Sequence, residues 1–302
     1  MGSGSIPTTT GTYYFVNSAT TGDSIGSAGN DGKSPQSPLA TVQQAIDKCT
    51  AGKGDVIILM PGHAETVTAT SIALNKSGVS VVGLGQGLLR PTFTYGAAAA
   101  TVTVSAANCS WSNTHHIANF LDVASAFTIG AAKDFKLDGN TFYDNSSILN
   151  FLVIVTTGAT NNDADGLTLT GNRWGGLAAT SGAFVSILAN ERRLYVADNV
   201  VNKVSTNNAG QFITLSSKLI TDAYIGGNRL TVTGAAGTTV GVFLTGSGTT
   251  STGLVEYNRV ASLDTTGALI ATANTGLYYI ENYYTGALDA SGAVWPTADN
   301  PA

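Results

Sequence analysis

The chain has 302 residues, of which 14 are basic and 19 acidic, so charged residues make up only 11% of it and the net charge is −5. This balance leaves no electrostatic footprint for nucleic acid, and no apolar run is long enough to cross a membrane. With 43% hydrophobic residues and 36 glycines, the sequence is typical of neither a disordered nor a membrane-spanning protein, and its polar surface must be made from Thr, Ser, Asn and Gly.

The first part of the chain, residues 1–36, is rich in Gly, Ser and Thr and is interpreted as an N-terminal extension with one apolar strand at residues 13–16. Its beginning lacks the basic and apolar regions of a secretory signal, so we expect a protein made in the host cytoplasm without a signal peptide. Cys49 and Cys109 are the only cysteines, and we expect two free thiols rather than a disulfide.

A capping helix is predicted within residues 37–54. Ser37 can act as its N-cap, Pro38 fits its first position, and one apolar face is marked by Leu39, Val42, Ala45, Ile46 and Cys49. Glycines follow it directly and would end it. A single amphipathic helix ahead of an all-β chain is predicted to cover the open N-terminal end of a solenoid.

An internal repeat fills the second half of the chain. A short apolar segment that ends in asparagine recurs at Asn140, Asn172, Asn199, Asn228, Asn258 and Asn282. A second apolar line, beginning at residues 151, 184, 212, 242 and 269, interleaves with the first, and weaker earlier members are assigned at Asn108 and Asn119. Two strands and a turn asparagine describe one coil of a parallel β-helix. The asparagine is explained by its tolerance of left-handed backbone and by amide hydrogen bonds to the equivalent residue one coil away.

The repeat predicts an all-β fold: a right-handed, single-stranded parallel β-helix over residues 55–288, with a C-terminal tail at residues 289–302. At residues 37–96 the chain resembles the pectin-lyase-like β-helix superfamily, on the segments 37–47, 54–65, 78–85 and 90–93. Within it, the chain is most similar to β-helix proteins of tailed phages and prophages, because it shares their corner at residues 63–68 and their short Ala-rich ending.

The resemblance implies a non-enzymatic virion structural protein, either a head decoration or a fibre-like β-helix. Such a protein would form a homotrimer and bind other virion proteins such as the major capsid protein. Two alternatives stay open. One is a tailspike-like polysaccharide depolymerase, either a lyase or a glycoside hydrolase, and the other is a bacterial surface filament or adhesin. We expect no nucleic-acid or membrane partner and leave glycan binding open.

Lyases of this superfamily use a basic residue to remove a proton. The candidates here are Arg173, Arg192, Arg193, Lys203, Arg229 and Arg259. Arg173, Arg229 and Arg259 directly follow a repeat asparagine, so they predict an exposed, solvated or partner-facing row rather than an active site. Glycoside hydrolases need paired carboxylates, whereas the acidic residues are scattered: Asp134, Asp138, Asp144, Asp198, Asp222 and Glu256. We therefore assign no catalytic residue and no cofactor.

The sequence offers two groups of candidate metal ligands. Asp163 and Asp165 lie in an oxygen-rich segment and are weak Ca²⁺ candidates, for which a polar loop is the favoured interpretation. His115 and His116 are interpreted as an ordinary turn pair, because no third metal ligand recurs at a suitable spacing. Three late aromatic residues are candidates for the homotrimer interface, or else for a cap on their own last coil: Tyr283, Tyr284 and Trp295.

Overall fold

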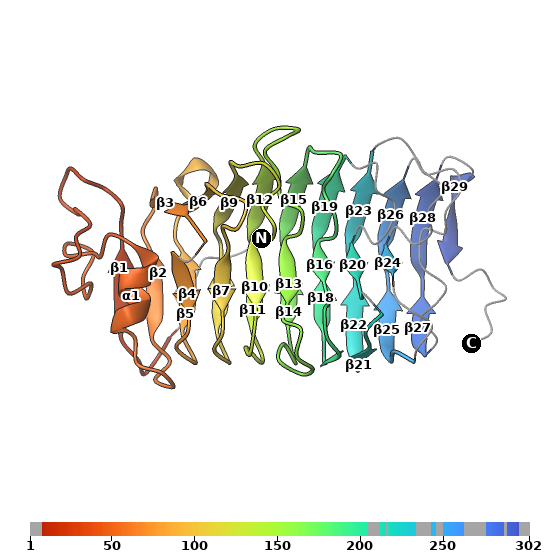
Figure 1. Ribbon diagram of the computed structural model, residues 1–302, viewed down its shortest axis with the longest axis horizontal. Coiled ribbons are helices and arrows are strands. Elements are labelled where there is room, and N and C mark those ends of the chain that lie inside the picture. Colours follow the sequence, from red (N-terminus) through yellow and green to blue (C-terminus); the bar gives the residue numbers. More distant parts are fainter. Residues whose placement is uncertain are drawn as a thin grey trace.

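The computed structural model describes residues 8–69, 71–204, 212–215, 217–233, 243–245, 250–262, 276–286 and 289–295. Three sheets run along one elongated body, and the chain passes from one sheet to the next as it winds from the N-terminal to the C-terminal end (Figure 1). The predicted all-β parallel solenoid is confirmed. Among the described residues, no helix has the length and hydropathy of a membrane-spanning segment.

We name the sheets A, B and C. Sheet A has ten strands, in the order β1 (Tyr13–Val16), β2 (Val56–Leu59), β5 (Ser80–Gly83), β8 (Ser110–Ser112), β11 (Lys136–Asp138), β14 (Thr168–Thr170), β18 (Tyr195–Ala197), β22 (Ala223–Gly226), β25 (Gly253–Glu256) and β27 (Leu277–Ile280). Sheet B also has ten, namely β3 (Ala64–Val67), β6 (Thr92–Tyr95), β9 (His115–Ala118), β12 (Thr141–Asp144), β15 (Arg173–Gly176), β19 (Val200–Lys203), β23 (Arg229–Val232), β26 (Arg259–Ser262), β28 (Asn282–Gly286) and β29 (Asp289–Trp295).

Sheet C has seven strands, namely β4 (Ile72–Leu74), β7 (Val102–Val104), β10 (Phe127–Ile129), β13 (Val155–Thr157), β16 (Val185–Ser186), β20 (Ile213–Thr214) and β24 (Leu244–Thr245). The remaining elements are helix α1 (Val42–Lys48), the 3-10 turn η1 (Gly87–Leu89), and a two-stranded sheet of β17 (Glu191–Arg192) and β21 (Ile220–Thr221). Seven coils in the described part of the chain therefore place a strand in all three sheets.

Neighbouring coils pair in parallel, so each residue stacks on its equivalent one coil away. In sheet B, Phe93 pairs with His116 and His116 with Phe142, and all three side chains are buried. Beside sheet C, the rings of Phe184, Phe212 and Phe243 stack with centroid separations of 5.4 and 4.8 Å. These rings belong to the second apolar line of the sequence, whose last predicted member, at residues 269–270, lies outside the described residues.

Helix α1 begins at Val42, so the predicted start at Pro38 with Ser37 as N-cap is wrong. Thr41 is the N-cap, and its hydroxyl accepts a hydrogen bond from the backbone N–H of Gln44 in a capping box. The residues before it are extended because Leu39 pairs with β1: its N–H donates to the carbonyl of Phe15 at 2.8 Å. Tertiary pairing with an earlier strand therefore overrides the local helix signal.

The helix packs against β1, β2 and β4 at the N-terminal end of the solenoid (Figure 1). Val42, Ala45 and Ile46 are fully buried on that side. The Gln43 side chain accepts the N–H of Ala73 in β4 at 2.7 Å, so it occupies a donor that the first strand of sheet C would otherwise leave free. Covering an end strand in this way blocks edge-to-edge pairing with another chain.

At the other end, β29 pairs with β28, and this is the antiparallel pairing among the described strands. The segment predicted as a C-terminal tail thus contributes its first residues to sheet B. An antiparallel strand cannot continue the parallel winding, so the pairing changes character where the described part of sheet B ends.

Ile46 offers a test of the cap. We expect Ile46→Asp to lower the free energy of unfolding by several kcal/mol, because it buries a carboxylate without a partner. Thermal and denaturant unfolding would measure the effect. Lys53→Asp, at an exposed position just after the helix, is the control and should change little. Equal stability of the two variants would contradict a capping role for α1.

Candidate functional site

The corner between sheets A and B carries the six repeat asparagines, which we call the ladder asparagines: Asn140, Asn172, Asn199, Asn228, Asn258 and Asn282. All are fully buried. The Oδ1 atom of Asn199 accepts both the backbone N–H and the Nδ2–H of Asn172, each at 3.0 Å. Its Nδ2 donates in turn to Asn228 Oδ1 at 3.0 Å and to the carbonyl of Leu169 at 2.9 Å. Such amides have no free donor for a ligand, so the ladder holds coils together.

The left-handed backbone at this corner belongs to the residue before each ladder asparagine. These residues have φ between 47° and 66°, and they are Gly139, Gly171, Asp198, Gly227, Tyr257 and Glu281. The prediction that the asparagine itself occupies the left-handed region is therefore wrong by one position. The asparagine is selected for its amide, and the preceding residue makes the turn.

Thr114 continues the ladder by one coil toward the N-terminus and was missed in the sequence. Its backbone N–H and its hydroxyl both donate to Asn140 Oδ1, at 3.0 and 2.8 Å. Aligning residues 109–114 with residues 135–140 would have found it. The predicted early members lie elsewhere: Asn108 precedes β8, and Asn119 follows β9 and accepts a bond from Asn145 at 2.9 Å.

A polar groove of about 830 Å³ opens along this corner, and its walls include Arg90, Asn113, Asp138, Thr141, Arg173 and Asp198. Arg90 is tied into the wall by three hydrogen bonds. Its Nη1 donates to Thr141 Oγ1 at 2.9 Å, and its Nη2 donates to the carbonyls of Gly139 at 2.6 Å and Thr114 at 3.1 Å. Burial lowers the pKa of the Arg90 guanidinium below its usual range. This arginine therefore links coils that are 24 to 51 residues apart.

The two carboxylates of the groove lie at the ends of strands that are not neighbours in sheet A. Asp138 ends β11 and Asp198 follows β18, and strand β14 lies between those two strands in sheet A. Asp138 accepts the hydroxyl of Thr170 and has Lys136 Nζ at 3.6 Å. A Cβ placed on Gly227 would lie 2.6 Å from Asp198 Oδ1, so that carboxylate is directed at the next coil and away from Asp138. Acid and base roles require carboxylates that face a common substrate.

His115 and His116 lie in strand β9, so their interpretation as a turn pair is wrong. The strand alternation sends His116 into the core, where it lies between Phe93 and Phe142 with ring centroids 5.4 and 4.9 Å away. Its Nε2 is 2.7 Å from Thr114 Oγ1, and burial lowers its pKa well below the usual range. His116 is therefore a neutral core residue that completes an aromatic stack.

The calcium candidates lie in the loop between β13 and β14. Asp165 Oδ1 accepts the backbone N–H of Arg192 at 2.8 Å, and Glu191 Oε2 accepts that of Ala164 at 3.0 Å. Burial raises the pKa of Glu191 to about 7. Within the described ranges, no three His, Cys, Asp or Glu side chains are grouped so that they could hold a metal ion. The side chains of Asp165 and Glu191 thus bind backbone amides. The backbone carbonyl of Asp163 accepts the N–H of Ala132.

A buried acid and a buried amine flank Gly176 in sheet B. Asp144 accepts the backbone N–H of Leu177 at 2.9 Å and the hydroxyl of Ser181 at 3.1 Å. Lys203 Nζ donates to the Ser181 carbonyl at 3.0 Å and lies 4.6 Å from the centroid of the Trp174 ring. Burial lowers the pKa of Lys203 to about 7. Together the two side chains hold the segment between β15 and β16 from both sides, which assigns Lys203 a structural role rather than that of a catalytic base.

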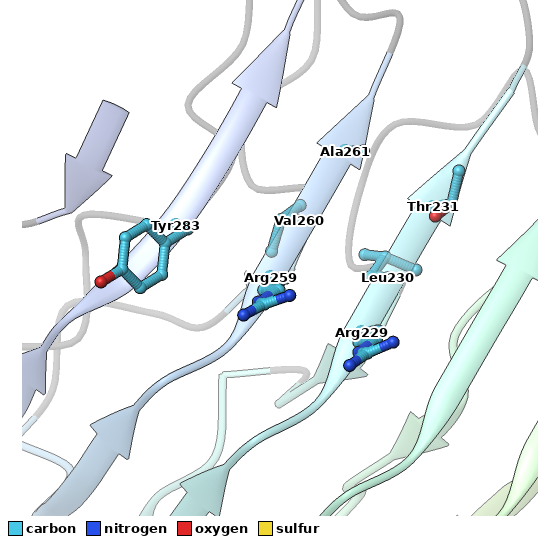
Figure 2. Close-up of a pocket in the computed structure, with 7 residues that line it drawn as sticks. All are labelled: Arg229, Leu230, Thr231, Arg259, Val260, Ala261 and Tyr283. Carbon is cyan, nitrogen blue, oxygen red and sulfur yellow. The ribbon is translucent and has the colours of Figure 1, made fainter. Parts of the chain in front are cut away.

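An arginine row runs along the outer face of sheet B. Arg229 pairs with Arg259 in the next strand, and Val200 stands between Arg229 and Arg173. All three arginines are exposed. Figure 2 shows Arg229 and Arg259 side by side, with Tyr283 on the following strand. These residues border a shallow hollow of about 230 Å³.

Of the predicted interface residues, Tyr283 is 41% exposed at the end of this row. The backbones of Tyr284 and Trp295 belong to β28 and β29. The side chains of both residues lie outside the part of the chain that the structure describes.

Asn199 tests the ladder. We expect Asn199→Ala to lower the free energy of unfolding by about 3 kcal/mol or more, since each buried polar group left unpaired costs ~1–3 kcal/mol. Two donors of Asn172 and the carbonyl of Leu169 would lose their partner. Denaturant unfolding would measure the loss. Asn202→Ala removes the same group from an exposed position three residues along, and it should be close to neutral. Similar losses in both variants would contradict the ladder's role.

Lys203 gives a pH-dependent test. The unfolded amine keeps its proton to about pH 10.4, whereas the folded amine releases it near 7. The unfolded state therefore binds more protons between these values, and the free energy of unfolding should rise with pH by a few kcal/mol across that window. Lys203→Met should flatten this rise, while Lys136→Met, at a side chain that is 49% exposed, should keep it. Parallel curves for wild type and Lys203→Met would refute the assignment.

The comparisons with known proteins give one likeness of fold. No family model matches the chain, and no curated protein matches it. Among solved structures, a chain described as rhamnogalacturonan lyase is similar over 90% of this chain and 87% of its own, with 13% sequence identity and a TM-score of 0.45. At that identity and score, the likeness supports no statement about activity, and the chain stands as a parallel β-helix on its own topology.

Proposed function

We propose that the protein is a non-enzymatic structural rod of a phage virion, a head decoration or a fibre-like element. In this proposal it assembles as a homotrimer and binds other virion proteins. A structural rod needs stiffness along its axis, closed ends and a surface for its neighbours. The ladder, the capped N-terminal end and the outer faces of the sheets meet these needs.

One observation carries the proposal: two polar side chains of the A–B corner groove, Arg90 and Asp138, bind residues in other coils of the same chain. The guanidinium of Arg90 donates hydrogen bonds to the carbonyls of Thr114 and Gly139 and to the hydroxyl of Thr141. Asp138 is engaged by Thr170 and Lys136. Groups used in this way join coils to each other and are poorly placed to move protons on a substrate. The virion assignment itself is supported by the resemblance of the sequence to phage β-helix proteins.

Imaging of particles tests the location. Phage particles produced by the host that carries this gene would be labelled with a gold-conjugated antibody against the purified protein and examined by electron microscopy. We expect regular labelling at one place on the particle, on the head or on a fibre. Labelling of bacterial surfaces without particles would contradict the proposal and favour a surface filament or adhesin.

A glycan-cleaving enzyme is the second candidate, favoured by the groove of about 830 Å³, which has room for a few sugar residues. Incubation with polygalacturonate and with host capsular polysaccharide would test it, with unsaturated products and new reducing ends as the readouts. We expect neither. If cleavage occurs and Asp138→Asn or Asp198→Asn abolishes it in a folded protein, the structural proposal fails.

A further inference from the structure

The outward residues of sheet B differ in charge from the rest of the chain. On strands β15, β19, β23 and β26, the outward charged side chains are Arg173, Arg229 and Arg259. The other outward positions of these strands are neutral at pH 7, and they include Val200, Asn202, Thr231 and Ala261. No carboxylate lies within 4.0 Å of the three guanidinium groups in the described residues. Once these three are set aside from the 14 basic residues, 11 remain against 19 acidic ones.

Sheet A presents the opposite set on the adjacent face. Its outward residues include Asp138 and Glu256, and the corner after it adds Asp198 and Glu281, both exposed. The one outward lysine on these strands, Lys136, is already 3.6 Å from Asp138. These carboxylates occupy the stretch from β11 to β27, and the arginines occupy the stretch from β15 to β26. Two rods lying side by side at equal height would therefore bring the two sets together.

Aromatic residues accompany the carboxylates on sheet A. Tyr195 and Tyr224 stack with centroids 4.9 Å apart, and Tyr278 continues their column at 72% exposure. Arginine and tyrosine are enriched at protein interfaces, and a guanidinium also gains by lying against an aromatic ring. The hollow between Arg229 and Arg259, about 230 Å³, is smaller than the ~300 Å³ from which small-molecule pockets usually start. A charged strip with so small a hollow fits a protein surface better than a small molecule.

We propose that sheet B of one copy docks on sheet A of a second copy, with Arg173, Arg229 and Arg259 facing the carboxylates of the neighbour. The contact joins two different surfaces, so every copy keeps one free face of each kind until the assembly closes into a ring. Charge complementarity favours a second copy of this chain as the partner. Apart from the arginine row, the chain carries more acidic than basic residues, so its other surfaces can attract the arginines. The inference rests on the self-assembly in the proposed function but not on the virion location.

The test is the oligomeric state of the full chain, measured by sedimentation velocity at low and at high salt. We expect wild type to form an oligomer that weakens as salt screens the contact. Arg229→Glu with Arg259→Glu should lower the association constant at least tenfold. Lys33→Glu with Lys53→Glu changes the net charge equally at exposed positions away from both faces, and it should leave association within twofold of wild type.

A charge exchange within one chain makes the test specific. Asp138→Lys with Glu256→Lys should also weaken association, and all four substitutions together should restore it, since they restore complementarity at the wild-type net charge. Circular dichroism confirms folding, and Arg229→Gln with Arg259→Gln serves if the glutamate variants fail to fold. A monomeric wild type, equal losses in the control, or no recovery in the fourfold variant would overturn the proposal. A monomer that binds polygalacturonate through the same arginines would overturn it and assign the face to an anionic glycan. Gold labelling on particles stays informative in either case.

Discussion

Parallel coils stacked in register place every side chain directly against its equivalent, about 4.8 Å away, for the length of the rod. A column of like charges would repel itself at this spacing, while a column of apolar or self-complementary groups reinforces itself. Asparagine satisfies the condition in a buried column because one carboxamide both donates and accepts. Aspartate at the same place would face another aspartate. The low content of charged residues, 11%, follows from the same constraint.

Charged residues that depart from this constraint indicate which surfaces contact other groups. Arg229 and Arg259 are equivalent residues of adjacent coils and stack like on like at an exposed edge. No carboxylate of the described residues lies within 4.0 Å of these two guanidinium groups, so a partner surface could supply one. Inside, the opposite solution is used: Asp144 and Lys203 stand one strand to either side of Gly176 and share the segment that follows it. These two buried polar groups are satisfied by hydrogen bonds to that segment.

The sequence predicts those parts of the architecture that recur along it at regular spacing. The ladder asparagines and the second apolar line recur visibly, so the solenoid and the exposed arginine row could be derived. Strands β1 and β29, however, lie in segments that were predicted to be outside the solenoid. Features that depend on the register between strands could not be predicted. Leu39 pairs with β1 in place of starting the helix, His116 turns inward because of the strand that contains it, and Arg90 binds residues as far as 51 positions away. These contacts join residues that are far apart in the sequence and become neighbours only when the chain winds into coils. No local sequence pattern indicates such partners.

From β8 onward, two residues separate the paired part of each sheet A strand from that of the following sheet B strand, as between Asp138 and Thr141 or between Glu256 and Arg259. The last described turn keeps this spacing, because Glu256 pairs with Ile280 and Arg259 with Tyr283. The other two edges vary, so that successive ladder asparagines are 24 to 32 residues apart. Insertions are therefore expected to fit better at the two edges of variable length than at the constant one. One residue added at the constant edge would reverse the facing of the side chains in the sheet B strand that follows it, whereas a peptide inserted near Ser146 would lie in the loop between β12 and β13.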